Sequence, residues 1–232
     1  MYTPIETLLY IFIYGTAIFL IFFIPFSLVI RALGKRTKEM RIEAGNRGFS
    51  FTHKGDGSLL ASLKDLFLMN CANINYSQER NLLTKREGST QITLADLGLK
   101  SSKYRTDSVT TPVTVLCCKT EDLTLPEFHV IPEHMPDRAG SKSDCGGIDF
   151  VGYPNFSKRY VLGGKDEAAV RDLFHRLGII DLLERKKGLC VEGKGPSLII
   201  YRHVDGTPCI VPTAELDAFI DEGRQIFSLL SE

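Results

Sequence analysis

The feature that most constrains this chain is an uncharged apolar run near its start. No charged residue occurs from Thr7 to Ile30, and Leu, Ile and Phe dominate the run. As a helix it would measure roughly 36 Å at ~1.5 Å per residue, enough to cross a hydrocarbon core of ~30 Å. The sequence therefore predicts a transmembrane helix over residues 7–30, after a short N-terminal segment, residues 1–6.

Two other interpretations of the run are a cleaved signal peptide and a buried helix of a globular domain. A signal peptide has a positively charged start, a shorter apolar region and a cleavage site of small residues. This chain has no positive charge in its first six residues, and no such site follows the run. So long a charge-free run is rare in a buried helix, and the hydropathy rule favours an anchor.

Basic residues cluster directly after the run. Residues 31–47 carry a net charge of +4, although the net charge of the whole chain is +0. Because basic flanks stay on the cytoplasmic side, the cluster predicts an external N-terminus and a cytoplasmic domain. Residues 31–46 are predicted to form a basic juxtamembrane linker. Its candidate membrane-surface residues are Arg31, Lys35, Arg36, Lys38 and Arg41. These cations either contact anionic headgroups, at ~1 kcal/mol each, or act only as a topology signal.

Residues 47–232 are long enough to bury a core. Turn residues separate short apolar segments with strong β propensity from longer segments with helical periodicity. Hairpins imply antiparallel pairing, so the predicted fold class is α+β: a transmembrane helix, then a soluble domain of mainly antiparallel sheet with packed helices. Two subdomains could divide near residues 121–126. Strands are expected at 48–52, 91–99, 112–119, 127–131, 159–162, 189–192 and 197–203, and helices at 166–177, 179–187 and 213–230. Segment 59–69 fits helix or strand, segment 70–87 is expected to be irregular or weakly helical, and 133–147 is expected to be a loop. Gly163-Gly164 is expected to turn the chain, and Asp166 is expected to cap the helix that follows.

The last of these helices has an apolar stripe at three- and four-residue steps. Thr213 is expected to cap it, and its stripe is expected to pack on the sheet. The stripe consists of Leu216, Phe219, Ile220, Ile226, Phe227 and Leu230.

Six cysteines occur, without C-x-x-C spacing: Cys71, Cys117, Cys118, Cys145, Cys190 and Cys209. In a cytoplasmic domain they are expected to be free and mostly buried thiols. Cys117 and Cys118 are adjacent on an expected strand, so at least one faces the core. Cys145, between Asp144 and Gly146, is the better candidate for an exposed thiol, but nothing beside it could act as its base.

Gly188 to Gly195 comes close to a phosphate-binding loop. The segment fits G-x-x-x-x-G-K, but Gly195 stands where the motif needs Ser or Thr for magnesium. A phosphate loop also leads into a helix N-terminus, whereas a strand is expected here. We interpret the segment as a hairpin turn and expect no nucleotide to bind.

His129, Glu133 and His134 bring two imidazoles and a carboxylate close in sequence. Two histidines share a helix face at a separation of four residues, but these are five apart and Pro132 interrupts any helix. A metal site here would need distant ligands, and the sequence predicts no metal and no cofactor. The balanced charge also argues against a nucleic-acid partner.

The second half, roughly Leu123 to Arg202, resembles a group of uncharacterised bacterial proteins with a single membrane anchor. The resemblance implies an anchored α+β domain at a bacterial inner membrane, and it implies no activity. It rests on Leu125-Pro126-Glu127-Phe128, Pro132-Glu133, Ile148-Asp149-Phe150, Pro154, Phe156-Ser157, Tyr160, Asp166-Glu167, Val170-Arg171, Leu173-Phe174, Val191-Glu192-Gly193 and Tyr201-Arg202. The first half matches less well, because Thr93–Leu97 lacks the group's aromatic-rich strand.

The sequence thus favours a non-catalytic, membrane-tethered domain that binds a protein or a lipid surface. The motifs of nucleophilic, metal-dependent and phosphate-transfer chemistry are not found, and no small-molecule ligand can be identified. The alternative is an enzyme whose site is assembled from scattered residues such as Cys145, His129 or His134.

Overall fold

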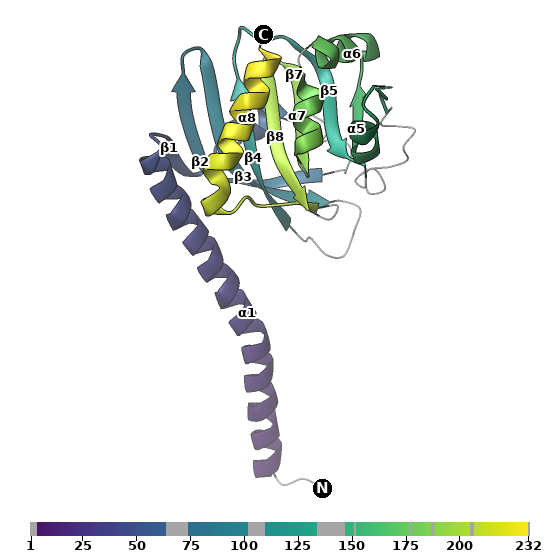
Figure 1. Cartoon of the computed structure of the whole chain (residues 1–232). Helices are drawn as coiled ribbons and strands as arrows, with labels where there is room; N and C mark the ends of the chain where they lie inside the picture. The colour runs from purple at the N-terminus through teal and green to yellow at the C-terminus, as the bar shows by residue number, and fades with distance from the viewer. Residues whose placement is uncertain are drawn as a thin grey trace.

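Helix α1 (Pro4–Asn46) projects from the rest of the chain as a long rod (Figure 1). The computed structural model describes residues 4–63, 74–101, 110–133, 147–150, 152–176, 178–186, 188–204 and 207–231. Side chains of α1 are described at residues 12–24 and from Arg31 onward. The C-terminal part of α1 lies against the domain, while its N-terminal part extends away from it.

The domain is built on one antiparallel sheet. Its strands, in chain order, are β1 (Ser50–Lys54), β2 (Ile74–Glu87), β3 (Thr90–Ser101), β4 (Thr110–Lys119), β5 (Leu125–Pro132), β6 (Tyr160–Gly164), β7 (Leu189–Gly195), β8 (Ser197–Val204) and β9 (Thr207–Pro208). Their spatial order is β1-β2-β3-β4-β8-β7-β5-β6, with β9 paired to β8. Each of these pairs is antiparallel, as the hairpin signals predict.

One strand pair joins the two halves of the sheet. Strands β1 to β4 form a meander from the first half of the chain, and the other strands come from the second half. The joining pair is β4 with β8, in a register that runs from Val115 opposite Tyr201 to Lys119 opposite Ser197. The two halves therefore share a continuous sheet.

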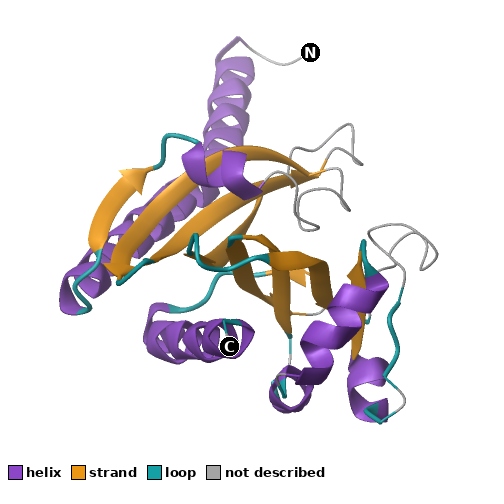
Figure 2. Ribbon diagram, turned by 90° about the horizontal axis from the view of Figure 1, so that it is seen from above, coloured by secondary structure: helices purple, strands orange, loops and turns teal. Residues whose placement is uncertain are grey.

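Side chains of β4 and β8 alternate between two apolar clusters, one on each face of the sheet. Leu116 and Ile200 belong to the larger cluster, with Phe219, whereas Val115 and Tyr201 belong to the smaller one. Helix α8 covers the first face, and the short helix α2 contributes Leu63 to the second (Figure 2). The helices of the domain are α2 (Ser58–Leu63), α5 (Pro154–Arg159), α6 (Glu167–Arg176), α7 (Ile179–Arg185), the 3-10 turn η1 (Thr213–Glu215) and α8 (Leu216–Leu230).

Helix α8 packs on the sheet with the predicted stripe. Leu216, Phe219, Ile220, Ile226 and Leu230 are buried, and Phe227 packs at the edge of the cluster. Gly223 lets the helix approach closely, because a Cβ there would lie 2.1 Å from Leu116 Cδ2.

The predicted helix caps had mixed outcomes. Asp166 caps α6 as predicted, since its Oδ1 accepts the Ala169 N–H at 3.1 Å. The predicted Thr213 cap is wrong: α8 begins after Glu215 without a side-chain cap, and the Thr213 hydroxyl instead donates to Glu39 at 3.3 Å.

Two local predictions were wrong because sheet pairing overrides local polarity. Residues 74–87, expected to be irregular or weakly helical, form the long strand β2, which pairs on both sides. Its register shifts between Arg80 and Leu83, where Asn81 has a left-handed φ of 52°. Gly163 and Gly164 were expected to turn the chain, but both pair with β5. The predicted loop between Glu133 and Gly147 lies largely outside the described residues.

The prediction of a transmembrane helix over residues 7–30 is wrong by the measure of helix length and apolarity. Among the helices formed by the described residues, none is both long and apolar enough to cross a membrane. The predicted single-pass placement in a bacterial inner membrane, with an external N-terminus and a cytoplasmic domain, is therefore not supported either.

Candidate functional site

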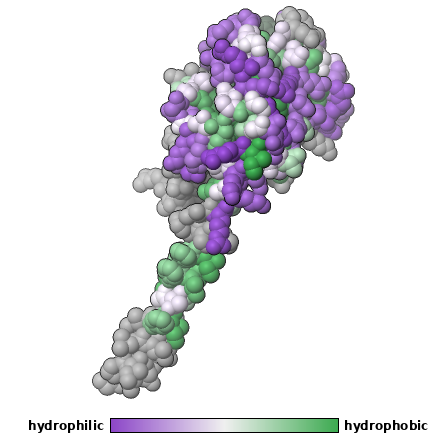
Figure 3. Space-filling model, turned by 90° about the vertical axis from the view of Figure 1, so that its left-hand side faces the viewer, coloured by the Kyte–Doolittle hydropathy of each residue, from purple (hydrophilic) through white to green (hydrophobic). Residues whose placement is uncertain are grey.

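The N-terminal part of α1 carries apolar side chains that the domain does not cover. We call residues 12–24 the apolar segment. Consecutive residues are exposed: Phe12 by 72%, Ile13 by 50% and Tyr14 by 64%. Since neighbouring residues on a helix point about 100° apart, this exposure extends around all sides of the rod. Figure 3 shows the segment as a green band separate from the mainly hydrophilic domain.

The C-terminal part of α1 is built into the domain. Met40 is fully buried and Ala44 is 1% exposed, and both belong to the large apolar cluster with α8 and the sheet. Arg47 adds an ion pair to Asp217 of α8, with Nη2 and Oδ2 2.8 Å apart. We call Arg36, Met40, Ala44 and Arg47 the helix seat. It fixes the direction in which α1 leaves the domain.

The polar centre of the helix seat is the pair Arg36–Asp96. Two guanidinium nitrogens of Arg36 each donate to an Asp96 carboxylate oxygen at 3.2 Å. Asp96, in the middle of β3, also accepts hydrogen bonds from Asn81 at 2.9 Å and from the Thr114 hydroxyl at 2.8 Å. The Thr114 oxygen in turn accepts the Val211 N–H at 3.1 Å. The buried carboxylate is therefore fully engaged by side chains from three elements, α1, β2 and β4.

The sequence contains a signal for this network that belongs to no known motif. Asp96 interrupts the apolar strand Thr93-Leu94-Ala95-Asp96-Leu97 and is 6% exposed. A buried carboxylate needs a charged or hydrogen-bonding partner. That requirement predicts a buried cation from elsewhere in the chain, although it does not identify Arg36.

The five predicted surface cations divide into three groups in the structure. Arg36 is committed to Asp96, with its side chain 13% exposed. Arg41 is exposed, and its guanidinium carbon lies 5.1 Å from the centre of the Phe51 ring. Arg31, Lys35 and Lys38 are exposed and follow one another at four- and three-residue steps. Such steps place them on one face of α1, and we call these three the basic stripe.

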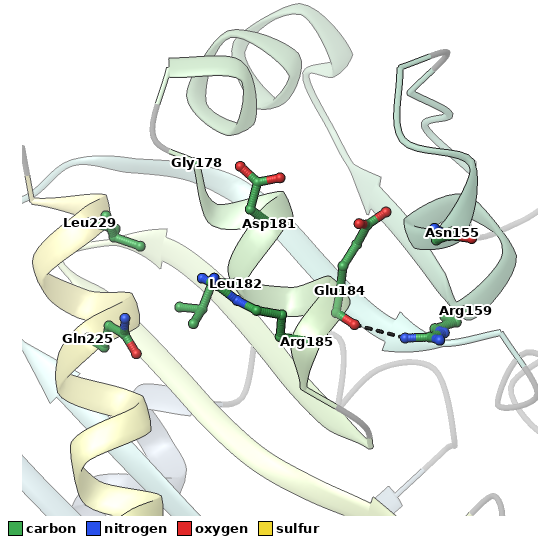
Figure 4. Close-up of a pocket in the computed structure, with 9 residues that line it drawn as sticks. All are labelled: Asn155, Arg159, Gly178, Asp181, Leu182, Glu184, Arg185, Gln225 and Leu229. Carbon is green, nitrogen blue, oxygen red and sulfur yellow. Dashed lines mark hydrogen bonds between the residues drawn. The ribbon is translucent and has the colours of Figure 1, made fainter.

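A shallow cavity of about 700 Å³ lies between α5, α7 and α8 (Figure 4). Its charged groups balance, with Asp181 and Glu184 against Arg159 and Arg185. Arg159 donates to the Glu184 carbonyl at 2.8 Å, and a Glu184 carboxylate oxygen accepts the Phe156 N–H at 2.8 Å. These contacts tie α5 to α7 and engage part of the polar lining. The cavity is lined by Asn155, Arg159, Gly178, Asp181, Leu182, Glu184, Arg185, Gln225 and Leu229.

The thiols of Cys117 and Cys118 on β4 are packed in the core. Burial raises the pKa of the Cys117 and Cys118 thiols to about 12. Burial also raises the pKa of Cys190 well above its ordinary value, with the Glu192 charge adding to it. A nucleophilic cysteine needs a lowered pKa, so none of these three is activated. Cys145 lies outside the described residues.

The second face of the sheet also holds a buried Tyr–Glu pair. The Tyr201 hydroxyl donates to Glu192 Oε1 at 2.8 Å, and both residues are fully buried. Burial, followed by the Glu192 charge, raises the pKa of Tyr201 well above its ordinary value. The hydrogen bond lets both polar groups reside inside the smaller apolar cluster.

The segment Gly188 to Gly195, which comes close to the phosphate-loop motif, is part of a hairpin, as predicted. Gly188 precedes β7, and Lys194 and Ser197 pair at the end of the β7–β8 hairpin. The Lys194 ammonium lies 3.0 Å from a Glu127 carboxylate oxygen of β5. Among the described residues, no three His, Cys, Asp or Glu side chains lie where they could share a metal ion. His129 lies in β5, and His134 is outside the described part of the chain.

Comparison with known proteins identifies a shared fold. Neither a protein-family model nor a curated protein matches this chain. The crystal structure of the mycobacterial trehalose monomycolate transport factor A, TtfA, is similar, with a TM-score of 0.58 over 84% of this chain and 93% of that chain. The two sequences are 11% identical, and at that level the likeness shows the fold alone.

Proposed function

We propose that this chain is a non-catalytic interaction protein that α1 holds at a lipid surface, with an accessory role in transport. The observation that carries the proposal is the contrast along α1: an apolar segment exposed on every side, followed by a helix seat locked into the domain. A large exposed apolar surface marks an interaction site. In this proposal α1 attaches the chain to the lipid surface, and the domain is held at that surface.

The distribution of exposed residues around α1 favours lipid over a protein groove. A helix that docks in a groove has one apolar side and a polar side that faces water. Here Ile21, Phe22 and Phe23 are consecutive and are 65%, 73% and 52% exposed. A lipid surface can accommodate apolar side chains that point in several directions, whereas a single groove covers one side.

The side chains of the domain support a non-catalytic role. The cysteines of β4 have strongly raised pKa values, and the lysine of the near-miss phosphate loop pairs with Glu127 in a hairpin. The transport association comes from the fold neighbour, whose title describes a transport factor for trehalose monomycolate. For the present chain we propose only the accessory character of that role.

Flotation with phosphatidylcholine vesicles tests the attachment. The full chain, diluted out of mild detergent, should float with the vesicles. The double variant Ile21→Asp/Phe22→Asp should remain at the bottom of the gradient, because charged side chains resist transfer into lipid. Val204→Asp is the matched control, since Val204 is 59% exposed but lies on β8, and it should float like the wild type. Flotation of the double variant at the wild-type level would contradict the proposal.

A further inference from the structure

The basic stripe faces away from the domain. At roughly 100° per residue, Arg31, Lys35 and Lys38 fall within an arc of about 60° on α1. Met40 and Ala44, the buried residues of the helix seat, point to the opposite side of the helix. The docking that fixes α1 therefore also fixes the stripe in an outward position.

The charges of the stripe are weakly engaged by the protein itself. The Lys35 ammonium lies 3.7 Å from a Glu39 carboxylate oxygen, but the Lys35 side chain is 80% exposed. Exposed pairs of this kind are worth little and are screened by salt. Arg36, by contrast, lies on the domain side of α1 and is held by Asp96. The helix thus uses Arg36 for its own packing, whereas the three cations of the basic stripe point outward.

The position of the stripe matches the boundary between an apolar and a polar phase. It follows the apolar run within the same helix and precedes the helix seat. From Arg31 to Lys38 it extends ~10 Å along the helix axis. Anionic headgroups occupy this boundary in a lipid surface that carries them, and basic side chains beside an apolar anchor are attracted to them.

We infer that the basic stripe of Arg31, Lys35 and Lys38 binds anionic lipid headgroups. The inference rests on the proposed lipid attachment of α1 and adds a selectivity to it: the apolar segment gives affinity for lipid, and the stripe gives preference for negatively charged lipid. Loss of two of the three cations should weaken partitioning into anionic vesicles by roughly 30-fold at low salt. Partitioning into neutral vesicles should not change.

The test compares partitioning of the full chain between two kinds of vesicle, phosphatidylcholine alone and phosphatidylcholine mixed with phosphatidylglycerol. The wild type should prefer the mixed vesicles, and salt should reduce that preference because the Debye length is ~10 Å at 0.1 M. Lys35→Gln/Lys38→Gln should lose most of the preference. Lys158→Gln/Lys165→Gln is the control, since it removes two exposed lysines elsewhere and should keep it.

The outcomes separate this inference from the proposed function. If the wild type binds neither kind of vesicle, the lipid attachment itself is wrong. If it binds both kinds equally, or if the stripe variant keeps the full preference, the attachment stands and the inference fails. Inorganic phosphate at matched ionic strength should displace no more protein than chloride does. Stronger displacement by phosphate would assign the stripe to a soluble anion.

Discussion

Arg36 on α1 and Asp96 on β3 form a two-point hydrogen-bonded ion pair across 60 residues of sequence, with both contacts at 3.2 Å. The pair is largely buried, and Asn81 and Thr114 complete the hydrogen bonding of the carboxylate. The pair joins the C-terminal part of α1 to the sheet. The direction in which the apolar segment leaves the domain therefore depends on this pair.

Removing one member of this pair should destabilise the chain. Asp96→Ala leaves the Arg36 guanidinium buried without its counter-charge, and such changes cost about 3–5 kcal/mol. Urea unfolding of the full chain in mild detergent measures the loss. Lys35→Gln, on the exposed face of the same helix, should cost no more than ~0.5 kcal/mol. Equal midpoints for the two variants would show that the pair does not hold the helix seat.

Truncation of a buried aromatic residue of α8 should have a similar effect. Phe219 is fully buried against the sheet, with the Arg202 guanidinium carbon 5.6 Å from its ring centre. Phe219→Ala should lower the free energy of unfolding by ~3–5 kcal/mol, as expected for a buried Phe. Gln225→Ala, at an exposed position of the same helix, is the comparison. A negligible difference between the two would mean that α8 is not part of the core.

Two glycines at the two ends of β7 provide a matched pair of substitutions. Both have a left-handed backbone, with φ of 68° at Gly188 and 55° at Gly195. A Cβ at Gly188 would lie 2.4 Å from the His203 carbonyl oxygen, whereas a Cβ at Gly195 would meet nothing within 4 Å. Gly195→Ala should therefore cost only about 1–2 kcal/mol of conformational strain, and Gly188→Ala distinctly more. Thermal unfolding ranks the two, and the reverse order would contradict the geometry.

Thiol labelling should distinguish buried from accessible cysteines. Since the pKa values of Cys117 and Cys118 are raised to about 12, both thiols stay protonated at pH 8 and are shielded from reagent. Iodoacetamide followed by peptide mass spectrometry should leave both unlabelled in the native chain and labelled in urea. Rapid native labelling of either one would indicate that β4 is exposed.

Acid should weaken the contact between α8 and the end of α7. Burial raises the pKa of Glu222, but hydrogen bonds from Lys186 and Arg202 outweigh it, so the net pKa is lowered. A carboxylate with a lowered folded-state pKa stabilises the native state above its ordinary pKa. That contribution is lost as the pH falls through the folded-state pKa. Glu222→Gln should thus flatten the acid side of a stability–pH profile, and an unchanged acid side would argue against these ion pairs.

Much of the sheet could be predicted because its strands carry local signals. The alternation in Gln91–Leu99, the β propensity of Pro112–Lys119 and the glycine-rich turn before Ser197 each determine a strand or hairpin by themselves. Strand β2 could not be found this way, because its polar residues are held by partners on both sides. Its strand state depends on neighbours distant in sequence.

The candidate site could be predicted only in outline. The composition of α1 identifies an apolar run followed by cations. The sequence treats those five cations as equivalent, whereas the fold takes Arg36 inward to Asp96 and leaves the basic stripe outside. The helical period alone separates the two sets, but which side faces the domain depends on Met40 and Ala44 meeting a sheet that forms later in the chain.

The pairing of β4 with β8 has a consequence for the time course of synthesis. The centre of the sheet can form only after Tyr201 has been synthesised, because Tyr201 pairs with Val115. At ~5–20 residues per second, that wait lasts roughly 4 to 17 seconds. During this interval the free edge of β4 presents unpaired backbone groups to other nascent chains, and exposed edges of this kind template aggregation. A chain truncated before Ser197 therefore keeps this strand edge open.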